Sequence, residues 1–217
     1  QSNLLMKSNK ERNKIMELLT QNSKLKKTSK HFNKRVFNFG LPAYKSNTGK
    51  VVCRMADECI KFCYAKKGAY IWSNVFPAFE KRLKISMQDN FVDLMVAEIK
   101  KKNVEYVRVH DSGDYYDKRY LAKWFKIAEL LPNVRFYSYT NEVGMIKKSK
   151  DIPKNYDFIF SGSGKQKDLI DKKTDRHSKI FDSLESLKKD KYTNCSNYDL
   201  YATRWYNDTK KVGLIYH

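Results

Sequence analysis

The alternation that decides the fold is clearest in residues 106–139, which read YVRVHDSGDYYDKRYLAKWFKIAELLPNVRFYSY. A short valine-rich strand, Tyr106–Val109, comes before a polar loop, and Asp117 is placed to cap a helix whose apolar residues share one face. Pro132 ends that helix, and Val134–Tyr139 then has the composition of a second strand. A strand, a helix and a strand in this order predict two parallel strands joined by a helical crossover.

The same alternation continues on both sides of this unit. Residues 73–102 carry apolar side chains at helical spacing, and we expect two helices there that meet near Gln88 and Asp89. The other elements that we expect are strands at Val36–Phe39, Tyr156–Phe160, Ile180-Phe181 and Val212–Tyr216, and a short helix at Glu142–Ser149. This pattern predicts an α/β fold. Eight clean units cannot be found, so a partial β/α barrel and an open parallel sheet both fit.

The N-terminal part of the chain differs from the rest. Residues 1–34 are predicted to form a basic N-terminal helical extension, with a short helix over about 9–20 and a polar connector over residues 22–30. Residues 35–217 are predicted to form a single β/α domain that carries the cysteine loop. A chain of 217 residues with 41% hydrophobic residues is long enough for one such domain and excludes a wholly disordered protein.

The charge of the chain favours a polyanionic partner. Lys and Arg number 44 against 24 Asp and Glu, and half of the resulting net charge of +20 lies before residue 51. Nucleic acid is the commonest partner of such a protein, and Lys24, Lys26, Lys27 and Lys30 are the candidate phosphate contacts. The alternative is a basic surface that is merely solvated. Nothing in the sequence indicates the oligomeric state.

No apolar run reaches the roughly 18–20 residues of a membrane span, and no secretory signal is visible. We therefore expect no membrane partner and a cytoplasmic location in a bacterial host. In a reducing compartment, crowded cysteines indicate metal or cluster ligation in preference to disulfides.

Cys53, Cys59 and Cys63 lie within eleven positions, whereas Cys195 is far away and is expected to be independent. Three thiolates in one loop can hold three irons of a four-iron cluster, and zinc is the second choice. The alternative is that three thiols lie close together by chance.

Polar loops follow four of the predicted strands: the cysteine loop, His110–Asp114, Thr140–Glu142 and Ser161–Gly164. Because the carboxyl ends of parallel strands share one edge, these loops should converge on one pocket. Gly113 permits a turn that aims its neighbours inward. His110, Asp111 and Asp114 also allow a metal-dependent hydrolase. The loop that begins at Ser161 fits either an anion site or a flexible turn.

The order of these motifs resembles the phage "gene product 88" family, which belongs to phages and other mobile elements and has no settled biochemical role. The matching words are Asn22-Ser-Lys-Leu-Lys-Lys27, Phe39-Gly-Leu-Pro-Ala43, Cys53…Cys59-x-x-x-Cys63-Tyr64-Ala65, Arg108-x-His110-x-Ser112-Gly113-Asp114 and the aromatic strand into Tyr139-Thr140.

The pattern also resembles a divergent radical S-adenosylmethionine fold, in which a three-cysteine loop after the first strand binds a four-iron cluster. The loop here has five and then three residues between its cysteines, where the standard loop has three and two. The resemblance implies that Phe62 or Tyr64 contacts the adenine and that Ser112-Gly113-Asp114 binds the amino group. Asn141 or Ser161 would hold the ribose or the carboxylate. Asp114 and Asn141 are the candidate catalytic residues.

Two functions follow from this resemblance and from the charge. The first is an iron–sulfur protein, encoded by a phage or mobile element, with radical S-adenosylmethionine-like chemistry on nucleic acid or a nucleotide. The alternative is a non-catalytic, basic nucleic-acid-binding protein in which a cluster or zinc only braces the fold.

Overall fold

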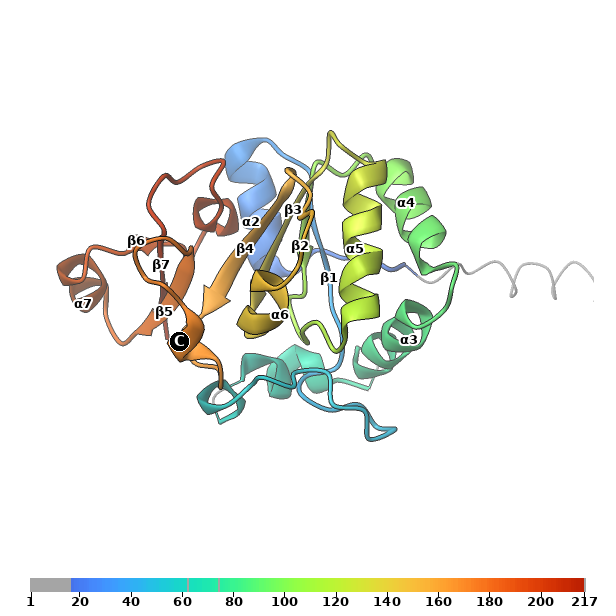
Figure 1. Cartoon of the computed structure of the whole chain (residues 1–217), viewed down its shortest axis with the longest axis horizontal. Coiled ribbons are helices and arrows are strands. Elements are labelled where there is room, and N and C mark those ends of the chain that lie inside the picture. The colour runs from blue at the N-terminus through green and yellow to red at the C-terminus, as the bar shows by residue number, and fades with distance from the viewer. Residues whose placement is uncertain (1–16, 62, 74, 217) are drawn as a thin grey trace, which may run out of the picture.

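The computed structural model describes residues 17–61, 63–73 and 75–216. Its centre is a seven-stranded sheet of parallel strands, which curls into a half-barrel flanked by helices (Figure 1). The prediction of an α/β fold is confirmed, and of the two predicted architectures the structure has the partial barrel.

The strands are β1 (Val36–Phe39), β2 (Tyr106–Val109), β3 (Arg135–Thr140), β4 (Tyr156–Ser161), β5 (His177–Phe181), β6 (Thr193–Asn194) and β7 (Lys211–Ile215). Their order in the sheet is β1-β2-β3-β4-β5-β7-β6, so the first five strands follow the chain. Because neighbouring strands pair in parallel, their carboxyl ends and the loops that follow them meet at one edge.

The α-helices are α2 (Ser23–Phe32), α3 (Phe76–Ser86), α4 (Phe91–Lys101), α5 (Lys118–Leu130), α6 (Val143–Lys147) and α7 (Leu184–Lys189). Five short 3-10 helices complete the described elements: η1 (Glu58–Ile60), η2 (Tyr64–Lys66), η3 (Gly68–Ile71), η4 (Lys167–Leu169) and η5 (Asp199–Ala202). Asp117 caps α5 as predicted, because its carboxylate accepts a hydrogen bond from the backbone N–H of Tyr120 at 2.8 Å.

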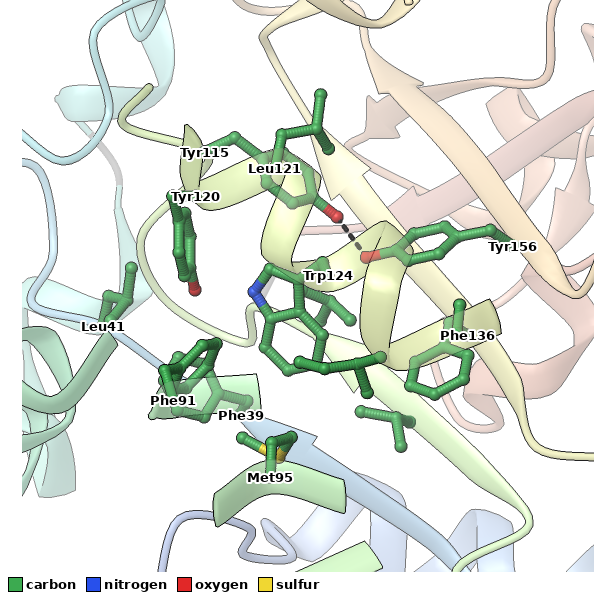
Figure 2. Packing of buried hydrophobic residues seen from close by; sticks show 14 of the residues in the cluster. Phe39, Leu41, Phe91, Met95, Tyr115, Tyr120, Leu121, Trp124, Phe136 and Tyr156 are labelled. Carbon is green, nitrogen blue, oxygen red and sulfur yellow. Dashed lines mark hydrogen bonds between the residues drawn. The ribbon is translucent and has the colours of Figure 1, made fainter. Parts of the chain in front are cut away.

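The larger core lies between one face of the sheet and helices α4 and α5 (Figure 2). Trp124 of α5 is fully buried and meets the rings of Phe39 and Phe91 edge-on, with centroids 5.4 and 5.6 Å away. The hydroxyls of Tyr115 and Tyr156 are 2.6 Å apart, so these buried polar groups satisfy each other (Figure 2). This core fixes the position of the loop between β2 and α5.

A second core covers the other face of the sheet. Leu25 of α2 and Leu200 of η5 pack there against Val36, Tyr106 and Tyr137. Successive residues of a strand point to opposite faces, so Tyr106 belongs to this core while its neighbour in β2 belongs to the larger one. The C-terminal segment and α2 therefore cover the sheet together.

The prediction of a polar connector at residues 22–30 is wrong, because most of this stretch forms α2. The side chain of Asn22 caps the helix by accepting a hydrogen bond from the N–H of Leu25 at 2.9 Å. Leu25 and Thr28 are buried, and Lys26, Lys27 and Lys30 lie outside that face. A helix is predicted from apolar residues that recur every three to four positions. With Leu25 as its one buried apolar residue, α2 lacks that repeat.

The helix predicted over about 9–20 lies mostly outside the described residues. Its last part, residues 17–20, is not helical. Thr20 pairs with Asn38 in an antiparallel bridge, and the N–H groups of Leu18 and Leu19 donate to the carboxylate of Glu98 at 2.8 Å. Tertiary contacts with β1 and α4 thus hold this segment in an extended conformation.

The other predicted elements are present, with ends that differ by three residues or fewer in the strands. The pair of helices in residues 73–102 is separated near Gln88, as predicted. Neither α7 nor the two-residue strand β6 was predicted. In the ranges that the structure describes, no helix has the length and apolar character that a membrane crossing requires.

Candidate functional site

A cavity of about 150 Å³ opens at the carboxyl edge of the sheet, between the loops that follow β1, β2 and β3. Cys53, Cys59 and Cys63 line it from the first loop. The residues that face them from the second and third loops and from the strand ends are Arg108, His110, Asp111, Ser112, Gly113, Tyr139 and Asn141. Residues that are up to 98 positions apart therefore form one site, as the parallel topology requires.

The three cysteines of the loop are partly buried and free of disulfides. Burial raises the pKa of the Cys53 thiol, and the nearby carboxylate of Asp114 adds to this effect. Burial also raises the pKa of Cys59. Within the described ranges, no three or more His, Cys, Asp or Glu side chains are arranged to hold a metal ion. The thiols thus share a cavity wall without converging on one metal position.

Cys195 lies apart from this loop. It is fully buried in the second core, beside β7, and its backbone N–H donates to the carbonyl of Gly213 at 2.9 Å. It does not line the cavity, so it differs from the three loop cysteines in burial and in surroundings.

The cysteine loop has few regular elements, and side chains attach it to the sheet. Arg54, next to Cys53, forms an ion pair with Glu142 of the third loop at 3.0 Å. Glu142 is buried, and burial together with nearby Asp114 raises its pKa to about 7, although Arg54 opposes this shift. Ala56 forms a bridge with Gly164 of the fourth loop. These contacts hold the cysteines over the strand ends.

Gly113 has the left-handed backbone that the predicted inward turn needs. Its φ is 83°, and a Cβ at this position would lie 2.6 Å from Cβ of Leu41. The backbone N–H of Leu41 donates to the carbonyl of Ser112 at 2.8 Å, which locks the turn against the segment after β1. A side chain at residue 113 would therefore push these two loops apart.

Asp114 does not line the cavity, and its carboxylate is used inside the protein. It accepts hydrogen bonds from the hydroxyl of Thr140 at 2.6 Å and from the N–H groups of Asn141 and Tyr115, both at 2.8 Å. Burial raises the pKa of Asp114 to about 6, and these hydrogen bonds oppose that shift. Asp114 joins the loops after β2 and β3, so its role in this structure is to position Asn141.

In the part of the chain that the structure describes, five residues around the cavity carry a buried polar atom without a hydrogen-bond partner. These atoms are Nε of Arg108, Nδ1 of His110, Oδ1 of Asp111, Oδ1 of Asn141 and the hydroxyl of Tyr139. Buried polar groups in folded proteins are almost always paired, with protein, water or ligand. Their concentration here marks the cavity as a place for a polar ligand or ordered water.

Arg108 and Tyr139 were not predicted as site residues. Arg108 pairs with the buried carboxylate of Asp199 at 3.2 Å, and its guanidinium lies 5.0 Å from the centre of the Tyr139 ring. The sequence feature that could have indicated Arg108 is its charge, because the strand around it is otherwise rich in valine. Its partner in η5 is 91 positions away, which sequence spacing does not reveal.

The remaining predicted residues fall in different places. Tyr64 lines the cavity, and its hydroxyl donates to the carbonyl of Asp111. Ser161 lines a second and larger cavity, of about 920 Å³, near the ends of β4 and β5. Phe62 lies outside the described residues.

The geometry gives little support to a hydrolase built on His110, Asp111 and Asp114. Nε2 of His110 is 2.8 Å from the hydroxyl of Tyr120, and burial lowers the pKa of this histidine to about 3. Asp114 is occupied by internal donors, so the three side chains do not form one ligand set.

The four candidate phosphate contacts all lie on α2. Lys24 is occupied, because its ammonium group pairs with Asp199 at 2.7 Å. Lys26, Lys27 and Lys30 are exposed.

Comparison with known proteins identifies the family but gives no activity. The model of the family described as Gene product 88 matches residues 16–214, which is nearly the whole chain. No curated protein and no solved structure matches. The match includes the cysteine loop, the turn at Gly113 and the lysines of α2. The chain therefore belongs to the Gene product 88 family.

Proposed function

We propose that this chain is an iron–sulfur protein of a phage or mobile element with radical S-adenosylmethionine-like chemistry on nucleic acid or a nucleotide. Cys53, Cys59 and Cys63 would hold a four-iron cluster, and the cofactor would bind in the adjoining cavity. One observation carries the proposal: the three thiols line the same cavity as Ser112 and Asn141, at the carboxyl edge of a parallel half-barrel.

The side chains present fit this assignment in kind. Three thiolates leave one iron of a four-iron cluster open to a further ligand. The unpartnered atoms of Arg108, Asp111 and Asn141 supply donors and acceptors for a zwitterionic molecule. At about 150 Å³ the cavity is below the roughly 300–1,000 Å³ of typical ligand sites. Binding therefore requires the cysteine loop to move outward and its thiols to converge.

A bound cluster would supply an electron for reductive cleavage of the sulfonium. The chain itself would bind, orient and exclude water. Asp111 lies in the cavity wall, and its Oδ1 has no hydrogen-bond partner among the described residues, so it replaces Asp114 as the group that would hold the amino end. Oδ1 of Asn141 would accept from a ribose hydroxyl. Asp114 would act as a positioning residue, through its hydrogen bond with the N–H of Asn141.

Anaerobic reconstitution with iron and sulfide tests the cluster. We expect about four irons and four sulfides per chain, and a broad absorption band in the visible range. Replacing Cys53, Cys59 or Cys63 by alanine, one at a time, should remove most of the bound iron. Cys195→Ala is the matched control and should keep it, because Cys195 lies in a separate core.

Iron that binds equally well to all four variants would contradict the assignment. Cofactor binding is measured separately, by calorimetry with S-adenosylmethionine on the reconstituted protein. Asn141→Ala should weaken that binding without lowering the iron content. Loss of iron in Asn141→Ala would show that the residue supports the loop instead.

A second candidate function rests on the charge of α2. This helix holds four lysines and no acidic residue, and three of the lysines are exposed. A non-catalytic nucleic-acid-binding protein, braced by a cluster or by zinc, needs only this surface. This second function would be favoured if the protein, purified without added metal, contains one zinc per chain. It should also bind nucleic acid and not bind S-adenosylmethionine.

A further inference from the structure

We infer that the outer face of α2 and the aromatic side chains beside η5 form a binding surface for single-stranded nucleic acid. We call this the α2–η5 surface, and define it by Lys26, Lys27, Lys30, His31, Tyr198 and Tyr201. The inference rests on the nucleic-acid partner proposed above and specifies the form of that partner and where it binds.

The lysine side of this surface has no nearby carboxylate on its own helix. Lys26, Lys27 and Lys30 are exposed, and α2 contains no Asp or Glu. Lys24 takes no part, because Asp199 neutralises it at 2.7 Å inside the fold. Among the described residues no carboxylate pairs with these three lysines, and three such cations on two turns of one helix match the phosphates of a nucleic-acid backbone.

Aromatic rings flank the lysines. The ring of His31 is stacked on that of Tyr198, with centroids 4.0 Å apart and planes inclined by 16°. Tyr201 meets His31 edge-on at 6.0 Å, and its hydroxyl is 3.2 Å from Nε2 of the histidine. His31 remains exposed although one ring face rests on Tyr198. Phe32 also meets His31 edge-on, with ring centroids 4.8 Å apart. The exposed part of the His31 ring is the part that would stack with a base.

A stacked ring beside exposed lysines is suited to single strands more than to a duplex. In a duplex the faces of the bases are covered by their neighbours, and only phosphates and groove edges are exposed. In a single strand the bases turn outward and stack on aromatic side chains, while the backbone follows the cations. The combination on α2 supplies both contacts.

The surface is well separated from the cysteine cavity. His31 lies at the C-terminal end of α2, just before β1 begins, so it is at the amino edge of the sheet, whereas the cavity is at the carboxyl edge. Figure 1 shows α2 running along the sheet, with its C-terminal end at the top of the view and the segment that carries the cysteines below the sheet. A single-stranded nucleic acid bound here would lie away from the proposed cluster. Its binding can therefore be measured on protein that carries no cluster.

Fluorescence anisotropy with labelled oligothymidylate of about 20 nucleotides, and with a duplex of equal length, tests the inference in the full chain. His31→Ala should weaken single-strand binding about 5- to 150-fold, the loss of one base stack, and leave the duplex unaffected. His31→Phe keeps a ring and should retain most of the affinity. His31 is exposed, so we expect both variants to fold.

The salt dependence tests the lysines. Replacing Lys26, Lys27 and Lys30 by alanine should lower the slope of log affinity against log salt by roughly 2 on the single strand. The matched control replaces Lys81, Lys100 and Lys101, three exposed lysines of α3 and α4, and should change the slope little.

Equal single-strand binding by His31→Ala and the wild type would overturn the α2–η5 surface but leave a nucleic-acid partner standing. Equal slopes of log affinity against log salt for the two triple-alanine variants would also overturn the α2–η5 surface and leave a nucleic-acid partner standing. Binding to neither oligonucleotide at about 50 mM salt would overturn both this inference and the nucleic-acid part of the proposed function.

Discussion

At the scale of single residues, the cavity depends on side chains that are engaged inside the protein as much as on those that face it. Asp114 was predicted to bind a ligand, yet three internal donors occupy its carboxylate. Asn141, which it positions, has a side-chain carbonyl oxygen that no described residue contacts by a hydrogen bond. A buried carboxylate needs such donors to remain in the fold, so Asp114 holds the two loops together, while Asp111 and Asn141 line the cavity.

Gly113→Ala tests the turn between these residues. We expect a loss of about 1–3 kcal/mol in the free energy of unfolding, because the new Cβ meets Leu41 at 2.6 Å and φ is 83°. Gly49→Ala is the matched control: its φ is 88°, but the nearest atom is a lysine carbon 3.8 Å away. Urea unfolding of both variants separates the steric clash from the backbone strain. Equal losses would mean that Leu41 moves aside at no cost.

At the scale of elements, α2 shows how a helix with little apolar surface becomes part of a core. Leu25 and Thr28 are its buried residues, and the hydroxyl of Thr28 accepts from the backbone N–H of Asp199 at 2.9 Å. Phe32 packs on Tyr206 with ring centroids 4.5 Å apart. The helix is held by segments from the far end of the chain.

Leu25→Ala measures how firmly α2 belongs to the domain. Leu25 is fully buried in the second core, so its truncation should cost about 2–5 kcal/mol in the free energy of unfolding, with a single cooperative transition. Lys26→Ala, one position along the same helix, should have almost no effect because that side chain is exposed. A small loss for Leu25→Ala would indicate an extension that detaches before the rest unfolds, which thermal and urea denaturation would both reveal.

At the scale of the whole molecule, Asp199 joins the two ends of the chain to the centre of the sheet. Its buried carboxylate pairs with Lys24 of α2 and Arg108 of β2, and it accepts from the hydroxyl of Tyr137 of β3 at 2.8 Å. Burial alone would raise the pKa of Asp199, but the two cations outweigh it and lower the pKa to about 2. The Asp199 carboxylate thus stabilises the fold at every pH at which it is ionised.

Because the pKa of Asp199 is lower in the folded than in the unfolded chain, its contribution is complete above about pH 4 and is lost as the pH falls toward 2. Asp199→Asn should cost about 3–5 kcal/mol at pH 7, since Arg108 keeps its charge without a partner. The variant should also lose less stability than the wild type between pH 4 and 2. Urea unfolding at several pH values checks both expectations.

Asp190→Asn is the control for this experiment. Asp190 pairs with Lys179 at 2.6 Å, but both side chains are largely exposed, so solvent screens the pair and the variant should remain close to the wild type. If Asp190→Asn and Asp199→Asn were equally stable, the buried pairs would contribute no more than a surface contact.

Local pattern alone determined much of this protein. The spacing of apolar residues predicted β1 to β5, the paired helices α3 and α4, and the capped helix α5, because each depends on neighbours within a few positions. The loops at one sheet edge followed from parallel pairing. Only the tertiary structure decided the helical state of α2, the Asp199 pairs and which polar atoms face the cavity. Their partners lie up to 175 positions away, as Lys24 and Asp199 do, and no local pattern encodes such contacts.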